Sequence, residues 1–480
     1  MRVLIVAPEL APLATAGGLG DVIGSLPLAL AELGCRVSVA LPAYRRAMER
    51  VETFETAESN LPITLGNMHL TVDIISGELA GGISLYMVRR DEFFDRQGIY
   101  GNSDGEYFDN LERYIFFSRS IPVLCSALGL RPNVILANDW QTGLVMALID
   151  QGALPGTSGV FVIHNMGYLG LVPPERAGNI GLPSQYYRMD GLEFHGQMSL
   201  LKAGIVYAKE IVTVSPTYSE EIQAQEFGFG LDGLMRSVRG RLHGILNGVD
   251  YQVWNPAKDR HIASGYSKED ITGKSACKQD LLGEMGLPPD LLDRPVAGMV
   301  SRLVGQKGCN LLIEAAEELF SLGMGLVVLG SGDAMYEDLF RSLKADHPDR
   351  FGLKLGFDPV LAHKIVAGSD IFLIPSLYEP CGLTQMYCLR YGTIPIVRST
   401  GGLKDTVIDP ADGKGQGTGF RFDRAEAADL VDAVKRALDA FYEIEVWEKM
   451  MKEGMSRDFS WRRSAKEYLN LFERVAGGGL

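Results

Sequence analysis

The chain has 480 residues, 46% of them hydrophobic and 22% charged, which is typical of a globular protein long enough for two domains. Its formal net charge is −14, and this acidic balance argues against a nucleic-acid or acidic-membrane partner, because both need a basic surface. Any anionic ligand must therefore be held by local cations.

Residues 2–7 are predicted to form the first element, a buried strand. This apolar run is too short for a signal peptide, and no run of about 18 apolar residues occurs along the chain. We therefore expect a cytoplasmic protein with no membrane partner.

A glycine-rich loop follows at 15–20, and Asp21 opens a predicted helix that ends near residue 33. The loop contains Thr15, Gly17 and Gly18. Such a loop lets the backbone approach a phosphate at the helix N-terminus, although a tight turn explains the same residues equally well. It lacks the G-x-G-x-x-G fingerprint, so a nicotinamide cofactor is not indicated.

Polar residues end two of the strands predicted in the first half of the chain. These strands are predicted at 37–40, 70–75, 83–88, 134–137, 160–164 and 211–214, with helical stretches between several of them, which indicates a largely parallel sheet. Asp139 and His164 lie at strand ends, where open α/β sheets bind ligands. Each has a structural alternative, since Asp139 can cap a helix beginning at Trp140 and a lone His is often structural.

A second series of elements follows a turn-rich segment around Asn247 and a polar segment at 257–280. Strands are predicted at 296–300, 325–329, 354–355, 371–374 and 394–397, and helices at 311–322, 336–343, 385–391 and within 425–475. We interpret the chain as two similarly built α/β domains with a cleft between them. The first comprises residues 1–248 with a C-terminal helix at about 459–480, and the second comprises residues 249–458.

The stretch from Pro375 to Gln385 connects a predicted strand to a predicted helix, at the edge of the sheet where ligands bind. Its carboxylate, Glu379, precedes a helix start that offers free backbone N–H groups to an anion. This combination suggests chemistry on a phosphorylated substrate.

The sequence requires neither a metal nor a cofactor. Its six cysteines show no C-x-x-C pair, and most lie in apolar contexts, as reduced core cysteines do. No Asp-x-Asp pair is present to carry a divalent metal on a diphosphate.

Four motifs occur in order along the chain: GGL at 17–19, SRLVGQKG at 301–308, PSLYEPCGLTQ at 375–385 and TGGLKDTV at 400–407. Together they resemble the bacterial glycogen synthase and plant starch synthase family over the whole chain. Members of this family are retaining glucosyltransferases of the GT-B architecture, in which two Rossmann-like parallel-sheet domains face each other across a deep cleft. The resemblance implies metal-independent transfer of glucose from ADP-glucose to the non-reducing end of an α-1,4-glucan. The first domain would bind the glucan and the second the nucleotide sugar.

The resemblance assigns roles to residues of the second domain. Arg302 and Lys307 would clamp the diphosphate and supply the positive charge that a metal provides elsewhere. Glu379 would contact the hydroxyls of the donor glucose, and Phe357 matches the aromatic residue that stacks on adenine. The motif that contains Glu379 would supply the remaining donor contacts, from Cys381, Gly382, Leu383 and Thr384. Leu383 and Thr384 would contribute backbone N–H groups.

In the first domain, His164 and Asp139 match an active-site His and an active-site Asp. Asn247 matches a residue near the donor hexose, and Asp21 belongs to the loop that contains Gly17 and Gly18. No second carboxylate is evident as a nucleophile, because the position that a related family fills with Glu is Tyr387 here. We therefore expect front-face substitution, in which the leaving phosphate accepts the proton of the acceptor hydroxyl.

Two positions depart from the family pattern. The lysine of the family's first loop is Thr15 here. The family's HAHDW is LANDW at 136–140, which keeps Asp139 but has Leu136 and Asn138 in place of both imidazoles. Two alternatives stay open: a related GT-B glucosyltransferase that uses UDP-glucose or another acceptor, and a catalytically weakened glucan-binding homologue. A phosphorylase is not indicated, because no segment resembles a pyridoxal-phosphate lysine site.

Overall fold

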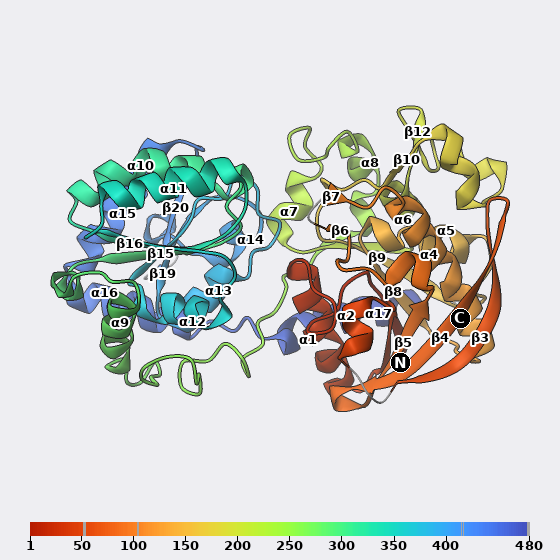
Figure 1. The fold of residues 1–480 in the computed structure, drawn as a ribbon, viewed down its shortest axis with the longest axis horizontal. Coiled ribbons are helices and arrows are strands. Elements are labelled where there is room, and N and C mark those ends of the chain that lie inside the picture. Colours follow the sequence, from red (N-terminus) through yellow and green to blue (C-terminus); the bar gives the residue numbers. More distant parts are fainter. Residues whose placement is uncertain (51–53, 103–104, 414, 416, 478–480) are drawn as a thin grey trace. The chain divides into compact units, whose positions relative to one another are not determined.

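The computed structural model describes residues 1–50, 54–102, 105–413, 415 and 417–477, which divide into two compact units (Figure 1). Unit 1 contains Met1–Gly248 and Trp461–Leu480, and unit 2 contains Val249–Ser460. The chain therefore leaves unit 1 after Gly248 and returns to it at Trp461. The sequence predicts these junctions at 248 and 458.

Unit 1 is built on a sheet of nine described strands in the order β14-β13-β9-β8-β1-β2-β5-β4-β3. Neighbouring strands are parallel, except that β4 is antiparallel to both β5 and β3 at one edge. The strands are β1 (Arg2–Val6), β2 (Arg36–Pro42), β3 (Glu55–Leu65), β4 (Met68–Leu79), β5 (Ile83–Arg89), β8 (Val134–Asn138), β9 (Ser158–Ile163), β13 (Glu210–Thr213) and β14 (Leu242–Gly244). Short strands form two further small sheets: β6 (Gly101–Asn102) with β7 (Gly105–Glu106), and β12 (Gln197–Ser199) with β10 (Leu171–Val172) and β11 (Glu193–Phe194).

The last helix of the chain belongs to unit 1, where it packs on the first (Figure 1). The carbonyl of Val475 accepts hydrogen bonds from Lys209 Nζ at 2.6 Å and from Ser158 Oγ at 3.0 Å, which fixes this helix to the sheet. The helices of unit 1 are α1 (Gly18–Glu32), α2 (Arg45–Glu49), α3 (Asp91–Phe94), α4 (Asn110–Ala127), α5 (Leu144–Asp150), α6 (Leu200–Tyr207), α7 (Pro216–Glu221), α8 (Asp232–Ser237) and α17 (Trp461–Gly477).

Unit 2 is built on a sheet of six described strands, all parallel, in the order β17-β16-β15-β18-β19-β20. The strands are β15 (Val296–Val300), β16 (Gly325–Gly330), β17 (Phe351–Leu355), β18 (Ile371–Ile374), β19 (Ile394–Arg398) and β20 (Phe420–Phe422). The helices are α9 (Gly273–Glu284), α10 (Cys309–Ser321), α11 (Ala334–Asp346), α12 (Pro359–Gly368), α13 (Thr384–Arg390), α14 (Gly401–Thr406), α15 (Ala427–Phe441) and α16 (Ile444–Met455).

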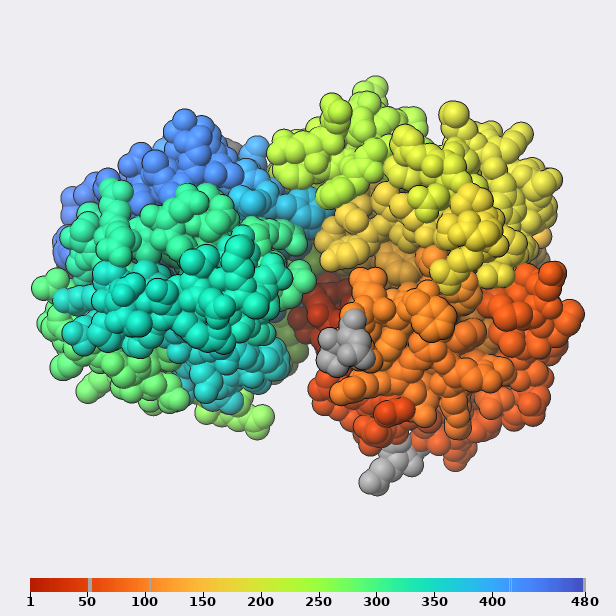
Figure 2. Space-filling view, turned by 45° about the horizontal axis from the view of Figure 1, so that its top comes forward, coloured from red at the N-terminus to blue at the C-terminus, as the bar shows by residue number. Residues whose placement is uncertain are grey.

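Helices cover both faces of this sheet, as a parallel sheet requires (Figure 1). Alternate residues of β16 point to opposite faces: Leu326 and Val328 pack with α10 and α15, whereas Val327 and Leu329 pack with α9 and α12. In the space-filling view, α10 and α11 form part of the outer surface of this unit, in green to teal (Figure 2). The continuous apolar runs of the sequence therefore become a core on each side of the sheet.

The predicted class of fold, two parallel-sheet α/β domains, is confirmed. The structure adds an antiparallel edge to the sheet of unit 1, formed by β3 and β4. All six cysteines are free and buried. Among the described residues, no helix combines the length and apolar character needed to cross a membrane.

Candidate active site

Each sheet has a point where the order of its strands reverses. In unit 2 the chain runs from β15 to β16 and β17 on one side, and then continues with β18, β19 and β20 on the other. In unit 1 the same reversal lies between β1 and β8. Open α/β sheets bind ligands beside such a point, at the carboxyl ends of the strands. Most of the predicted site residues lie in the loops that follow these strands.

The loops after β15 and β18 bring Lys307 and Glu379 into direct contact. Lys307 Nζ lies 2.5 Å from Glu379 Oε2, and Ser376 Oγ donates a hydrogen bond of 3.0 Å to the same oxygen. The Lys307 and Glu379 side chains are only 19% and 12% exposed, so water screens their interaction less than that of a surface pair. The fold therefore places this buried ion pair at the switch point.

Two glycines allow neighbouring loops to approach the Glu379 turn. Gly308 has a φ of +72°, and a Cβ there would lie 2.1 Å from the carbonyl oxygen of Pro375. Gly401 has a φ of +43°, and a Cβ there would lie 2.0 Å from the carbonyl oxygen of Glu379. Only glycine fits these close contacts, which fix the backbone that carries Glu379.

The turn from Cys381 to Thr384 leads into α13. Gln385 Nε2 donates hydrogen bonds of 3.0 Å to the carbonyls of both Cys381 and Gly382 and so fixes the turn. The Cys381 side chain is buried, so its thiol belongs to the core rather than to the surface of the site. The first backbone N–H groups of α13, near Leu383 and Thr384, have no acceptor within the helix, as at every helix start.

Arg302 and Phe357 are exposed on the same edge of the sheet as this turn. Arg302 follows β15, and its guanidinium makes no ion pair with any carboxylate of the described chain. Phe357 follows β17 and is 92% exposed, which leaves both faces of its ring open. The structure therefore places one cation and one aromatic surface where an anionic nucleotide could use them.

In unit 1 the glycine-rich loop leads from β1 into α1. Gly17 has an extended φ of −155°, and a Cβ added to Gly17 or Gly18 would meet no atom within 4 Å. The fold itself does not require glycine at these positions, so they keep a space open at the start of α1. Thr15 is exposed in the same loop.

Glu9, which the sequence did not single out, holds this loop. Its Oε2 accepts hydrogen bonds from the backbone N–H groups of Ala16 at 2.8 Å and Gly17 at 2.9 Å, and Tyr100 OH donates to Oε1 at 2.8 Å. Glu9 is buried directly after the first strand. An acid in that position, following Ala7-Pro8, is the signal that could have identified it.

Asp21 lies in the first turn of α1, on the side of the loop. Its side chain reaches solvent, yet desolvation by the surrounding chain, together with the charge of Glu9, raises the pKa of Asp21 to about 6. A carboxyl with this pKa changes its charge close to neutral pH.

Asp139 does not cap the turn that follows it. Its Oδ1 accepts hydrogen bonds from the backbone N–H of His164 at 2.7 Å and of Asn165 at 3.4 Å, so the capping interpretation is wrong. Its φ of +56° is a strained backbone conformation for a residue with a Cβ, and such strain clusters at functional sites. Burial raises the pKa of Asp139 to about 7, against the lowering effect of the two backbone N–H groups.

Asn138 sets the protonation of His164. The Asn138 Nδ2 group donates hydrogen bonds to the carbonyls of Val6 at 3.1 Å and Leu136 at 3.2 Å, so its Oδ1 must face His164 Nε2, 2.9 Å away. An amide oxygen only accepts, so Nε2 carries the proton and Nδ1 is the free lone pair. Burial lowers the pKa of His164 to about 3, which keeps the ring neutral.

Asn247 lies beyond β14, on the same edge of the sheet as Asp139 and His164. It is 8% exposed, and its Oδ1 is buried without a hydrogen-bond partner in the described chain. Such an oxygen is costly unless a ligand or water satisfies it. Among the described residues, no three His, Cys, Asp or Glu side chains gather as metal ligands would.

Comparison with protein families gives two matches along the chain. Residues 2–237 match the family described as starch synthase catalytic domain, and residues 289–451 match glycosyl transferases group 1.

Relatives of similar length match the whole chain. A glycogen synthase of Desulfatibacillum aliphaticivorans is 50% identical over 477 residues, covering 99% of both chains. A glycogen synthase of Koribacter versatilis is 43% identical over 480 residues, covering 99% of this chain and 98% of the relative.

Solved structures show the same similarity. The catalytic domain of starch synthase IV from Arabidopsis thaliana, bound to ADP and acarbose, superposes with a TM-score of 0.91 at 33% identity, covering 99% of each chain. A sucrose-phosphate synthase from Thermosynechococcus elongatus shares the fold at a TM-score of 0.64 and 16% identity, covering 100% of each chain.

Proposed function

Because the chain belongs to the glycogen synthase and starch synthase family and is a retaining glycosyltransferase, we propose that its donor is ADP-glucose and that it elongates α-1,4-glucans at the non-reducing end. The observation that carries the proposal is the Lys307–Glu379 pair at the switch point of unit 2, on the same edge of the sheet as the exposed Arg302 and Phe357. The starch synthase that shares this fold was solved with ADP bound, which supports an adenine nucleotide as the donor.

Positive charge around the donor diphosphate is the main requirement of the reaction, because the leaving group gains negative charge. Arg302 and Lys307 supply that charge, and the backbone N–H groups of Leu383 and Thr384 add donors at the start of α13. The ion pair with Glu379 holds Lys307 in place before the donor arrives, so little reorganisation is needed. Cys381 and Gly382 shape the backbone of this turn, and Phe357 stacks on the adenine.

Glu379 contacts the hydroxyls of the transferred glucose and places negative charge near the developing oxocarbenium ion. The position that a related family fills with a second Glu is Tyr387 here, whose ring is stacked on Trp254 with the ring centroids 4.0 Å apart. Transfer then proceeds on one face of the sugar. The bond between the anomeric carbon and the phosphate oxygen breaks, the bond to the glucan oxygen forms, and the leaving phosphate accepts the proton of the glucan hydroxyl.

Neutral polar groups of unit 1 contact the sugar in this proposal. His164 is uncharged and presents a lone pair at Nδ1, while Asp139 holds the backbone that carries it. Asn247 offers a buried oxygen that a sugar hydroxyl can satisfy. Gly17 and Gly18 leave room at the start of α1, and Asp21 lies beside them.

Thr15 favours a second candidate. It stands where the family has a lysine, and one cation fewer in this loop fits a different donor, UDP-glucose, or a glucan-binding homologue with weakened catalysis.

A transfer assay with radiolabelled ADP-glucose and UDP-glucose, a glycogen primer, and EDTA in a parallel arm tests these candidates. We expect label in glycogen from ADP-glucose at a rate that EDTA leaves unchanged. Preferential transfer from UDP-glucose supports the second donor, and glycogen binding without transfer from either donor supports the weakened homologue. The cytoplasmic location stays a prediction, to be checked by cell fractionation.

A further inference from the structure

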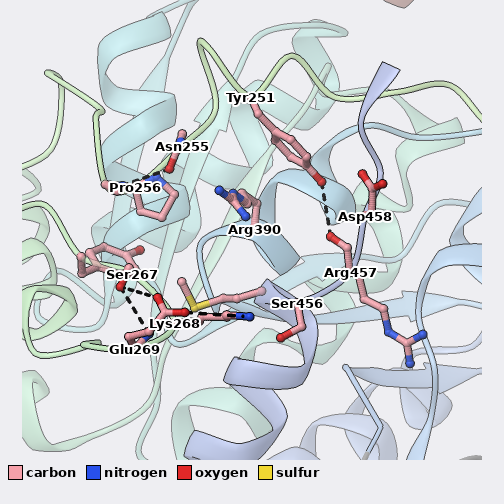
Figure 3. Close-up of a pocket in the computed structure, with 13 residues that line it drawn as sticks. Tyr251, Asn255, Pro256, Ser267, Lys268, Glu269, Arg390, Ser456, Arg457 and Asp458 are labelled. Carbon is pink, nitrogen blue, oxygen red and sulfur yellow. Dashed lines mark hydrogen bonds and ion pairs between the residues drawn. The ribbon is translucent and has the colours of Figure 1, made fainter. Parts of the chain in front are cut away.

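Unit 2 contains a cavity of about 400 Å³ (Figure 3). Its lining includes none of the residues assigned to the donor. It is lined by segments 251–257, 266–269 and 455–458, together with Arg390. This volume is in the range of cavities that bind small molecules, roughly 300–1,000 Å³. The first and last of these segments lie beside the two junctions where the chain passes between units.

Arg390 is the notable residue of this cavity. Its guanidinium carbon lies 4.7 Å from the centre of the Tyr251 ring, and the group points into the space between the lining residues (Figure 3). Its Nε is buried without a hydrogen-bond partner, and no carboxylate of the described chain forms an ion pair with it. A partly buried guanidinium without a contacting anion is unusual, because only the more distant charge of Glu269 offsets its desolvation.

The two acids of the lining hydrogen-bond to other groups, and Glu269 acts on Arg390 only through its charge, without an ion pair. Glu269 accepts a hydrogen bond from Ser267 Oγ at 2.9 Å and lies 3.9 Å from Lys268 Nζ, and Asp458 accepts from the backbone N–H of Ser460 at 2.9 Å. Lys268 is half exposed at the rim and can turn toward an anion. Arg457 is paired with Glu453 at 3.0 Å, and its guanidinium points away from Arg390 (Figure 3).

From these contacts we propose that the cavity is a binding site for a small organic oxyanion, a phosphate ester or a carboxylate. Arg390 holds the oxyanion through its planar fork, and Lys268 adds a second charge at the rim. Ser456 and Asn255 provide polar contacts for the rest of the molecule, and the Tyr251 ring forms an apolar wall.

We expect a ligand in this cavity to change the rate of the transfer reaction, and this part of the inference rests on the proposed function. Arg390 is the last residue of α13, whose first residue, Thr384, belongs to the proposed diphosphate site. Tyr251 OH accepts a hydrogen bond from the backbone N–H of Phe459 at 3.0 Å, and Val249 N donates to the Phe459 carbonyl at 2.7 Å. A ligand on Arg390 therefore bridges α13 and both connecting segments, and we expect its binding to change kcat.

Thermal unfolding of the full-length protein, titrated with inorganic phosphate or citrate at constant ionic strength, tests the site. We expect a saturable rise in Tm with at least one of the two anions, and the anion that binds identifies the chemical group. Arg390→Gln weakens this binding ~10- to 100-fold, and Lys268→Gln, at the exposed rim, weakens it less.

Two controls separate this site from others. Arg341→Gln removes an exposed, ion-paired arginine of the same unit and leaves the titration unaltered. Arg302→Ala removes the cation proposed for the donor phosphates, so the part of the Tm shift that remains in this variant belongs to the Arg390 cavity. The proposal is overturned if neither anion gives a saturable shift, or if Arg390→Gln binds as tightly as the unchanged chain.

The activity arm measures kcat for glucan elongation with and without the anion that binds. If the anion changes kcat of the unchanged chain but not that of Arg390→Gln, the coupling is supported. If kcat of the unchanged chain stays the same at saturating anion, the coupling is overturned. If no transfer occurs under any condition, the proposed function fails and the Tm titration still decides the binding site.

Discussion

The two units hold charge in opposite ways at the same place in their sheets. At the switch point of unit 2, opposite charges are paired at short distance, as between Lys307 and Glu379. At the switch point of unit 1, burial moves the pKa of Asp139 upward to about 7 and that of His164 downward to about 3, so both groups lean toward their neutral forms. We infer that unit 2 provides fixed charge for phosphates and unit 1 provides neutral hydrogen-bonding groups for sugars.

Removing Glu379, the acid of the ion pair in unit 2, is expected to have the largest effect on the rate. Glu379→Gln deprives Lys307 of its ion-pair partner and the glucose of its carboxylate, so we expect kcat to fall by ~10²- to 10³-fold, the size seen when one stabilising group is lost from an active site. Initial rates of glucan elongation at saturating donor measure this change.

Glu318→Gln is the matched control, because Glu318 forms a Glu–Lys pair with Lys435 at 2.7 Å on the exposed surface of the same unit. Its rate stays at the level of the unchanged chain. Equal rates for the two variants would contradict the role of Glu379.

The raised pKa of Asp139 in unit 1 can be tested through the pH dependence of stability. The pKa of Asp139 is about 7 in the folded chain and 3.8 in the reference state, so ionisation favours unfolding. The free energy of unfolding of the unchanged chain therefore falls by ~1.4 kcal/mol per pH unit as pH rises from about 4 to about 7. Above pH 7 the contribution of Asp139 to this free energy no longer changes with pH. Asp139→Asn does not titrate, so its stability relative to the unchanged chain rises across this window, as urea unfolding at each pH would show.

Asp429→Asn gives the opposite sign. Hydrogen bonding to Arg424 lowers the pKa of Asp429, so its stabilisation is present above the reference pKa of 3.8 and is lost as pH falls. This variant is slightly less stable than the unchanged chain at neutral pH and equal to it in acid. If the difference in free energy of unfolding between Asp139→Asn and the unchanged chain stays constant from pH 4 to 7, the pKa of Asp139 is not raised.

The exposed cation of unit 2 is expected to matter less than Glu379. Arg302→Ala removes one charge-assisted hydrogen bond to the diphosphate, worth ~1.5–3 kcal/mol, so kcat/KM falls by ~10- to 100-fold. Steady-state kinetics with varied ADP-glucose measure this loss. Arg341→Ala, on α11, is the control and keeps full activity; a loss no larger in Arg302→Ala than in the control would exclude the clamp.

Restoring the family lysine tests the departure in unit 1. Thr15→Lys adds a cation to the exposed loop before α1, and we expect turnover with ADP-glucose to rise, by about tenfold at most if one charge-assisted hydrogen bond of moderate strength forms. Parallel measurements with UDP-glucose show whether the change is specific to one donor. An unchanged or lower rate would mean that another group has taken over the role of the lysine.

The sequence predicts the central strands of unit 2 residue for residue, at 296–300 and 371–374, because both are short apolar runs bounded by polar residues. It does not predict β3, whose sequence ETAESNLPITL is largely polar because the strand lies at the edge of the sheet. The helix predicted at 385–391 is α13, which begins one residue earlier. Apolar patterning therefore identifies buried strands and leaves edges undefined.

Motifs predict the candidate site residues, but they do not predict which residues these contact. Lys307 and Glu379 are 72 positions apart, and only the fold brings them into contact. Asn138 reads in the sequence as a lost imidazole, whereas its amide fixes the tautomer of His164. Glu9 escaped notice because one buried acid leaves no periodic pattern. Long-range pairing and burial decide these roles, and neither is local information.

The return of the chain to unit 1 has a consequence for the order of folding. Unit 2 is continuous in sequence, whereas the sheet and α1 of unit 1 receive α17 only after all of unit 2 has been synthesised. On the ribosome, where domains generally fold as they emerge, the surface of α1 that α17 covers stays exposed throughout that interval. A nascent chain released before residue 461 would therefore leave exposed to chaperones the surface that the buried side chains of α17, such as Leu471 and Phe472, cover, even with unit 2 fully folded.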